Sequence, residues 1–344
     1  NMGFADEVAG DGKGGWTDQG AENDLRTLAP GVIRCAPVEF RIAGGRRAAI
    51  VLGKTPRRDF ASSARIDLNG KTAVVTGGGG ILCSSMAETL AACGAKVAIL
   101  DLKQESAQKV ADKINAAGGK AIGLAANVLE KESLLAAHEE VKAKFGPCDI
   151  LINGAGGNHP KGTTSKEFLE KADAEGSVEG KVSFFDLDPA GISFVFNLNF
   201  IGTLLPTQVF ARDMALNGKG VIINISSMNA FRPLTKIPAY SAAKAGISNF
   251  TQWLATHMAK VGIRVNAIAP GFFLTNQNRT LLTNPDGSLT ARGNTILTHT
   301  PMGRFGTPDD LSGTLLWLVD DGASGFVNGT VIPVDGGFAA FSGV

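Results

Sequence analysis

Short apolar runs rich in β-branched residues alternate with longer amphipathic stretches from Lys71 to the end of the chain. Continuous apolar strands separated by helices are typical of a parallel sheet covered on both faces. The sequence therefore predicts one α/β domain over residues 66–344, a Rossmann-like, doubly wound parallel sheet of about seven strands with helices on both faces. The expected strands are residues 72–76, 96–101, 121–127, 150–153, 220–226, 264–269 and 330–334. The expected helices are residues 84–93, 104–117, 131–145, 199–216, 241–261 and 308–318.

Residues 1–65 differ from the rest of the chain. They are acidic and glycine-rich at first, then arginine-rich, and they show no sustained period of 2 or 3.6. Such a segment is not expected to add a strand or a helix to the core. We interpret it as a poorly ordered N-terminal extension outside the fold, with an organelle-targeting segment as the alternative.

The composition favours a small-molecule ligand over nucleic acid or a membrane surface, because 33 basic and 32 acidic residues leave a net charge of +1. The four cysteines (Cys35, Cys83, Cys93 and Cys148) lack C-x-x-C spacing, and the four histidines are scattered. We therefore expect reduced, buried thiols, no disulfide framework and no metal site. No apolar run approaches the roughly 20 residues that span a bilayer, and the start lacks a secretory signal, which predicts a cytoplasmic protein.

A run of glycines, residues 77–80, joins the first expected strand to a helix that opens at Ser84. Glycines let the backbone turn tightly and approach a pyrophosphate closely, and the helix N-terminus offers N–H groups and a positive dipole end to the anion. A glycine-rich turn alone is usually only a turn, so its place between a buried strand and a helix is what favours phosphate binding. The residues expected to contact the dinucleotide here are Gly77, Gly78, Gly80, Ile81 and Leu82.

Asp101 ends the second expected strand, where its carboxylate could accept hydrogen bonds from the adenosine ribose hydroxyls. The carboxylate would repel a 2′-phosphate, which favours NAD over NADP, although Lys103 lies close by. A solvated carboxylate at a strand end is the alternative. The next two strands end at the same edge of the sheet, and the residues there are expected to line the adenine and ribose side: Asn127, Val128, Asn153, Ala155 and Gly156.

Tyr240 is the only tyrosine of the chain, and Lys244 follows it by four residues, so both lie on one face of a helix. Ser226 and Ser227 end the fifth expected strand, and Asn199 begins the helix before that strand. Together on a dinucleotide-binding sheet, these residues would give an acid/base, a cation that tunes it, a hydroxyl donor for a carbonyl and an amide that holds a water.

On these residues the sequence resembles the short-chain dehydrogenase/reductase family from about residue 66 to the C-terminus. The resemblance implies that Tyr240 is the general acid/base and that Lys244 lowers its pKa, both also contacting the nicotinamide ribose. It implies that Ser227 polarises the reacting carbonyl and that Asn199 supports a proton-relay water. It further implies a homotetramer or a homodimer, and a cover over the nicotinamide amide formed by Pro270, Gly271, Phe273 and Thr275.

The chain departs from the family pattern at two places. The usual loop, Thr-Gly-x-x-x-Gly-x-Gly, would place glycines at Ile81 and Cys83, whereas here they are concentrated at residues 77–80. The usual Asn-Asn-Ala-Gly segment becomes Asn153-Gly154-Ala155-Gly156, which removes one amide side chain. The pyrophosphate contacts are therefore expected to differ in detail, and only Asn153 is carried over from the amide pair.

Other segments resemble a subgroup of this family, the D-mannonate oxidoreductases or fructuronate reductases: residues 156–160, 196–200, 227–233 and 299–306. This resemblance implies interconversion of D-mannonate and D-fructuronate with NAD. A sugar acid needs a cationic or donor-rich clamp for its carboxylate and partners for its hydroxyls. The candidates, Asn158, His159, Asn229 and Arg232 beside Ser227, lie in loops at the carboxyl edge of the sheet; His159 could equally be a solvated loop residue.

Two alternatives to this function stay open. One is an NAD(P)-dependent reductase of another polyol or keto sugar acid, such as gluconate, and the other is a catalytically silent dinucleotide-binding protein. Two segments could cover the substrate. Residues 161–181 are rich in Lys and Glu and could be a surface excursion or a lid, and the polar, irregular residues 275–298 are the better placed lid candidate.

Overall fold

The computed structural model describes residues 39–41, 47–49, 66–176, 180–275 and 279–343. The chain separates into two units, residues 1–57 and 58–344. In the first, β1 (Glu39–Arg41) pairs antiparallel with β2 (Arg47–Ala49), a pairing that the sequence did not predict. The rest of the N-terminal extension, including Cys35, lies outside the described residues, so its interpretation stays a prediction.

The second unit contains a seven-stranded sheet in the order β5-β4-β3-β6-β7-β8-β9, and every neighbouring pair is parallel. The chain builds one half of the sheet outward from β3, returns to β6 beside β3 and builds the other half. This is the predicted doubly wound fold, and its topological switch point lies between β3 and β6. The strands are β3 (Thr72–Thr76), β4 (Lys96–Asp101), β5 (Lys120–Ala125), β6 (Ile150–Asn153), β7 (Gly220–Ile225), β8 (Ile263–Pro270) and β9 (Val331–Val334).

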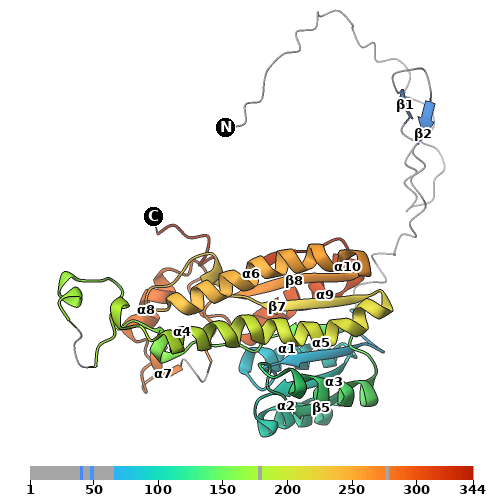
Figure 1. Ribbon diagram of the computed structural model, residues 1–344, viewed down its shortest axis with the longest axis horizontal. Helices are drawn as coiled ribbons and strands as arrows, with labels where there is room; N and C mark the ends of the chain where they lie inside the picture. Colours follow the sequence, from blue (N-terminus) through green and yellow to red (C-terminus); the bar gives the residue numbers. More distant parts are fainter. Residues whose placement is uncertain (1–38, 42–46, 50–65, 177–179, 276–278, 344) are drawn as a thin grey trace, which may run out of the picture. The chain divides into compact units, whose positions relative to one another are not determined.

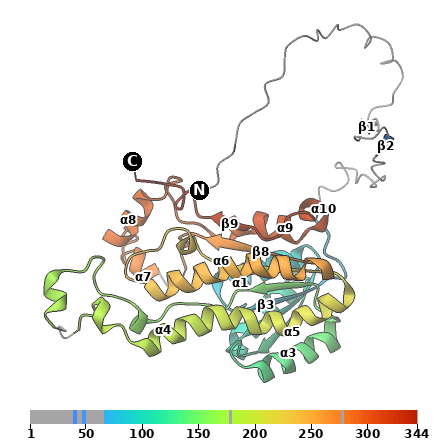
Figure 2. The same cartoon turned by 45° about the horizontal axis from the view of Figure 1, so that its top comes forward.

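Helices cover both faces of this sheet (Figures 1 and 2). Alternate strand residues feed two cores, as the period of a strand requires: Val75 packs in the core on one face, and Val74 in the core on the other. The first core holds side chains of α1 (Ile81–Ala92), α2 (Gln104–Ala116) and α9 (Ser312–Val319). The second holds side chains of α3 (Lys131–Phe145), α5 (Gly202–Asn217) and α6 (Pro238–Met258).

The prediction that a helix begins at Asn199 is wrong. A continuous helical run begins ten residues earlier with α4 (Pro189–Phe196), passes through a π-helical turn (Asn197–Ile201) and continues into α5. Asp188 caps its first turn by accepting a hydrogen bond from the Ala190 N–H at 2.8 Å. This run has 29 residues and contains an 18-residue window with a mean hydropathy of 1.3, so by length and composition it could cross a membrane, contrary to our expectation for the chain. Half of its apolar window is buried in the protein, which is typical of a core helix.

The described part of the segment 275–298, residues 275 and 279–298, is more regular than the sequence suggested. It contains α7 (Arg279–Leu282) and α8 (Ala291–Thr298), joined through a bridge between Thr283 and Leu289. Thr290 caps α8 by accepting a hydrogen bond from the Gly293 N–H at 3.1 Å. A short helix, α10 (Asp321–Ser324), was also missed because one turn carries no periodic signal.

The expectation of buried, reduced thiols is confirmed for two cysteines. Cys83 and Cys148 are buried and free, whereas Cys93 is free but partly exposed. Burial raises the pKa of Cys83 to about 12 and that of Cys148 further still. Both thiols are therefore neutral and act as small apolar side chains.

Lys236 occupies a strained position in the connection between β7 and α6. Its φ of 71° is the only positive value at a non-glycine residue in the described part of the chain. Its carbonyl accepts a hydrogen bond from the Thr164 N–H at 2.8 Å. This bond ties the excursion after β6, residues 161–176 and 180–186, to this connection. We expect Lys236→Gly to raise the free energy of unfolding by about 0.5–1 kcal/mol, measured in urea, because glycine adopts this φ without a Cβ clash. Lys236→Ala keeps the strain, so an equal gain in that variant would contradict the explanation.

Candidate active site

The structure brings Ser227, Tyr240 and Lys244 together at the carboxyl edge of the sheet. Tyr240 and Lys244 lie one turn apart on α6, and the Lys244 Nζ atom is 5.6 Å from the centroid of the tyrosine ring. The lysine is buried and its Nζ donates a hydrogen bond to the Ile225 carbonyl at the end of β7, at 2.7 Å. Ser227 follows β7 directly and shares a side-chain hydrogen bond with Tyr240.

Burial sets the acidity of both titratable groups. It raises the pKa of Tyr240, and the hydrogen bond with Ser227 acts in the opposite direction. It lowers the pKa of Lys244 to about 8. The net direction for Tyr240 is thus opposite to the lowering that we expected from the ammonium, because a desolvated phenolate is costly and the buried ammonium is itself disfavoured. The hydroxyl that most directly favours the phenolate here is that of Ser227.

Asn199 lies in the π-helical turn and is fully buried. Its Oδ1 accepts a hydrogen bond from the Gly157 N–H at 3.3 Å, and its Nδ2 donates to the carbonyls of Gly157 and Val195 at 2.7 and 2.8 Å. Both amide N–H groups are therefore committed to the backbone, so support of a proton-relay water by this side chain would be indirect. Its direct effect is to fix the segment after β6. A Cβ on Gly156 would lie 2.7 Å from Asn199 Oδ1 and 3.2 Å from Lys244 Nζ, so only glycine fits between them.

The glycine-rich loop is tightly enclosed by neighbouring residues. A Cβ on Gly77, whose φ is 63°, would lie 2.8 Å from the Ala155 Cα, and one on Gly78 would lie 2.6 Å from Ile99 Cγ2. The hydroxyl of Thr76 accepts hydrogen bonds from the N–H groups of Gly154 and Ala155 at 3.1 and 3.3 Å. Gly80 precedes the first turn of α1 without a side-chain cap. The N–H groups of Gly78, Gly79 and Gly80 are bonded to Leu100, Asp101 and Gly77. The donors that remain for a pyrophosphate are therefore the N–H groups in the first turn of α1.

Asp101 ends β4 beside this loop. One carboxylate oxygen accepts a hydrogen bond from the Gly79 N–H and the other from the Lys103 N–H, each at 3.1 Å. The carboxylate keeps further lone pairs for ribose hydroxyls. Asn127 does not end a strand as predicted, because its Oδ1 accepts from the Leu129 N–H and its Nδ2 donates to Glu130 in a local turn.

The remaining cofactor candidates lie around the same edge. Asn153 is buried and donates hydrogen bonds to Thr207 and Asn224, while its Oδ1 has no partner. Pro270 ends β8, and the Gly271 N–H donates to the Val334 carbonyl at 3.0 Å. Ile81 and Leu82 open α1, Val128 and Phe273 are buried, and Ala155, Gly156 and Thr275 are partly buried or exposed.

The substrate candidates are held in different ways. The Asn158 amide donates to the Thr163 hydroxyl at 3.0 Å, and His159 Nδ1 accepts from the Lys161 N–H at 3.2 Å while its ring packs 5.1 Å from that of Phe194. Arg232 is exposed, and its Nε donates to the Ala339 carbonyl at 3.0 Å. Asn229 differs from these three because it is buried and its Oδ1 has no hydrogen-bond partner.

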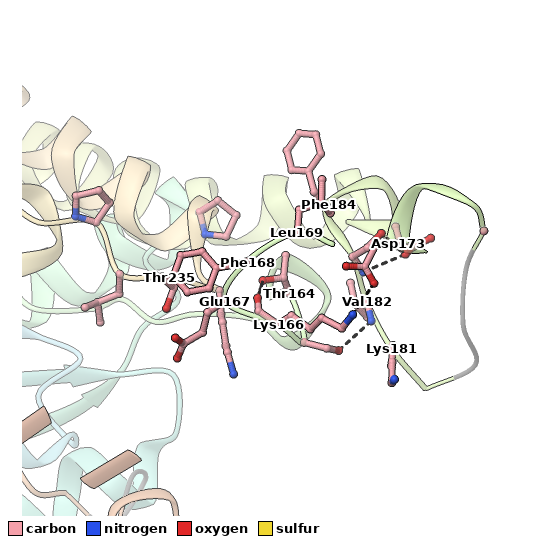
Figure 3. A pocket seen from close by; sticks show the side chains of 18 residues that line it. Thr164, Lys166, Glu167, Phe168, Leu169, Asp173, Lys181, Val182, Phe184 and Thr235 are labelled. Atoms are coloured by element: carbon pink, nitrogen blue, oxygen red, sulfur yellow. Dashed lines mark hydrogen bonds and ion pairs between the residues drawn. The ribbon is translucent and has the colours of Figure 1, made fainter. Parts of the chain in front are cut away.

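A cavity of about 440 Å³ lies apart from this constellation. Figure 3 shows it between the excursion after β6, which contributes Phe168, Leu169 and Phe184, and the β7–α6 connection, represented by Thr235. None of the predicted site residues lines it. The excursion projects from the body of the unit with its phenylalanines exposed, and its role as a lid stays a prediction. Across the described residues, no three metal-ligating side chains are grouped to hold an ion.

A comparison with known families decides the class of the protein. A family model described as short chain dehydrogenase matches residues 71–286. The chain belongs to the short-chain dehydrogenase family. It is therefore an oxidoreductase of a family that binds NAD(P), as the sequence predicted.

One relative and two solved structures show which oxidoreductases this chain is similar to. An uncharacterised oxidoreductase of Haemophilus influenzae is 58% identical over 282 residues, covering 82% of this short-chain dehydrogenase and 98% of the relative. A crystal structure from Haemophilus, assigned provisionally to a D-mannonate oxidoreductase with bound NAD, has a TM-score of 0.76 and 58% identity, covering 81% and 98% of the two chains. A gluconate 5-dehydrogenase from Burkholderia cenocepacia in complex with NADP and tartrate has a TM-score of 0.68 and 30% identity, covering 80% and 98%.

Proposed function

We propose that the protein interconverts a sugar-acid alcohol and its ketone with NAD, the substrate pair being D-mannonate and D-fructuronate. The observation that carries the proposal is the gathering of Ser227, Tyr240 and Lys244 at the carboxyl end of β7, beside the strand β6 that borders the switch point. The similarity to the structure assigned as a D-mannonate oxidoreductase supports the substrate.

The side chains can move the proton that the reaction requires. Bound NAD would supply the hydride acceptor for alcohol oxidation. The Tyr240 hydroxyl, as phenolate, takes the proton of the substrate hydroxyl, and in the reverse direction it returns a proton to the carbonyl oxygen. The Ser227 hydroxyl donates a hydrogen bond to that oxygen, and the Lys244 ammonium retains N–H groups for ribose hydroxyls after its bond to Ile225.

NAD is proposed over NADP because of Asp101. Its carboxylate lies against Gly79, at the end of the strand where the adenosine ribose is held in this fold. A 2′-phosphate at that point would face a negative charge. The Burkholderia relative was solved in complex with NADP, so NADP is the alternative cofactor. The ratio of the affinities for NADH and NADPH would distinguish the two.

A polyhydroxylated substrate is supported by Asn229. A buried amide oxygen without a partner costs about 1–3 kcal/mol, and a substrate hydroxyl would satisfy it. Asn229 lies two residues after Ser227, whose hydroxyl accepts a hydrogen bond from the Asn229 N–H at 3.2 Å. Arg232, with Asn158 and His159, is proposed to hold the carboxylate. A cytoplasmic location and a homotetramer or homodimer stay predictions.

The test is an assay of the purified protein with D-fructuronate and NADH, followed by the fall of NADH absorbance. Turnover of D-fructuronate well above that of 5-ketogluconate supports the proposal. Preference for 5-ketogluconate would favour the gluconate alternative. Binding of NADH without turnover of any sugar acid, ketone or alcohol would favour a catalytically silent protein.

Arg232→Ala is expected to raise KM for sugar acids by about 10- to 100-fold, because a hydrogen bond to a charged partner contributes about 1.5–3 kcal/mol. The exposed guanidinium uses its Nε for the Ala339 carbonyl, and its two NH₂ groups are the donors that we propose for the substrate carboxylate. KM for the corresponding neutral polyols should change little. Steady-state kinetics on both substrate types checks this, and equal losses would remove the carboxylate role.

A further inference from the structure

The two departures from the family pattern meet in space. Cys83 stands in the first turn of α1, where the family pattern has glycine, and Gly154 follows β6, where the pattern has asparagine. A Cβ built on Gly154 would lie 2.2 Å from Cys83 Sγ. No side chain at residue 154 can coexist with the present position of this thiol, so the sulfur fills the space that an asparagine would need.

Neither residue of this pair can move away easily from the other. Cys83 is buried in the core that contains Met86 and Leu90, and burial keeps its thiol neutral. The backbone of Gly154 cannot retreat freely, because its N–H donates to the Thr76 hydroxyl, and its Cβ would also lie 2.9 Å from the Thr76 carbonyl. The first turn of α1 and the segment after β6 are thus in direct contact through the sulfur.

The contact lies beneath the glycine-rich loop. Thr76 leads into that loop, and a Cβ on Gly77 would lie 2.8 Å from the Cα of Ala155, the neighbour of Gly154. A change in the spacing of α1 and residue 154 must therefore move residues 77–80, which are expected to hold the pyrophosphate. A misplacement of about 1 Å is enough to weaken such backbone contacts strongly.

We infer that Cys83 and Gly154 are a matched pair of positioning residues that sets the distance between the start of α1 and the end of β6, and through it the shape of the dinucleotide cradle. The inference rests on the proposed binding of NAD by this loop. It makes residue 83 the determinant of which residue is tolerated at residue 154.

A double-mutant cycle tests the pair with NADH as the probe. Gly154→Ala should weaken NADH binding by more than about 10-fold, whereas Cys83→Ala should change it by less than about 3-fold, because only one sulfur atom is lost. The double variant should recover most of the loss, since the Cβ atoms of the two residues would be 3.6 Å apart. Recovery should be incomplete because the contact with the Thr76 carbonyl remains.

Gly78→Ala is the matched control. Its Cβ clashes with Ile99 and not with the thiol, so Cys83→Ala should not rescue it. Dissociation constants are measured by NADH fluorescence, and urea unfolding without dinucleotide is measured for every variant. A positioning role also predicts that Gly154→Ala raises KM for NADH more than it lowers kcat at saturating NADH.

The outcomes separate this inference from the proposed function. Rescue of NADH affinity in the double variant, and not in the control, supports the pair. Rescue of stability alone, or no rescue although the wild type binds NADH, overturns the positioning role. A wild type that does not bind NADH overturns the proposed function, and the positioning role with it, while the unfolding cycle still measures the steric coupling.

Discussion

Tyr240→Phe should lower kcat by about 10²- to 10⁴-fold, the range that a general acid/base contributes. The substitution removes one hydroxyl and leaves the ring in its place near Lys244, 5.6 Å from Nζ to the ring centroid. The variant lacks the oxygen that bonds to Ser227 and that we propose as the acceptor of the substrate's hydroxyl proton. NADH affinity, measured by fluorescence, should change by less than about 3-fold, because the glycine-rich loop and Asp101 are untouched.

The neighbouring residue of α6 offers the control for this variant. Ser241 is buried and its hydroxyl has no hydrogen-bond partner, so Ser241→Ala removes a hydroxyl oxygen without removing a hydrogen bond. Its kcat should stay close to that of the wild type. Retention of more than about a tenth of kcat by Tyr240→Phe would mean that another group moves the proton.

The fold was predictable because its strands are short, apolar and buried on both faces. β3, β4 and β6 match their expected ranges residue for residue, since nothing in them competes with an extended conformation. The start of the α4–α5 run was predicted at Asn199 because the residues of α4 are almost all apolar and show no amphipathic period. The N-terminal signal in the sequence is Asp188 followed by Pro189, eleven and ten residues before Asn199.

The residue types of the site were predictable from spacing, but their electrostatics were not. Tyr240 and Lys244 share a helix face because they are four residues apart, and this follows from the chain alone. The directions of their pKa shifts follow from burial, which depends on what packs over them. Likewise the sequence revealed Cys83 and Gly154 as separate irregularities, and only the fold shows that one occupies the space left by the other.

Lys244→Met should combine a loss of activity with a change in the pH dependence of stability. The ammonium that we propose to hold the nicotinamide ribose is removed, so kcat/KM should fall by about 10²-fold or more, with KM for NADH raised. The long apolar side chain keeps most of the packing of the buried lysine, which limits collapse of the site. Steady-state kinetics with varied NADH separates the two effects, and the exposed Lys109→Met is the control for the loss of a positive charge.

The change in stability follows from the pKa of Lys244, which burial lowers from its ordinary value of 10.5 to about 8. Between about pH 8 and pH 10.5 the unfolded chain binds more protons at this residue than the folded protein does. The lysine therefore makes the free energy of unfolding rise with pH in this window. Below pH 8 both states are charged, and the folded state bears the full cost of the buried ammonium, at most about 3 kcal/mol. The free energy of unfolding of Lys244→Met, measured in urea, should therefore exceed that of the wild type most near pH 7. The difference between the two free energies should shrink toward pH 10. Parallel pH profiles for the two proteins would show that the ammonium is not desolvated, and the electrostatic part of the proposed site would have to be abandoned.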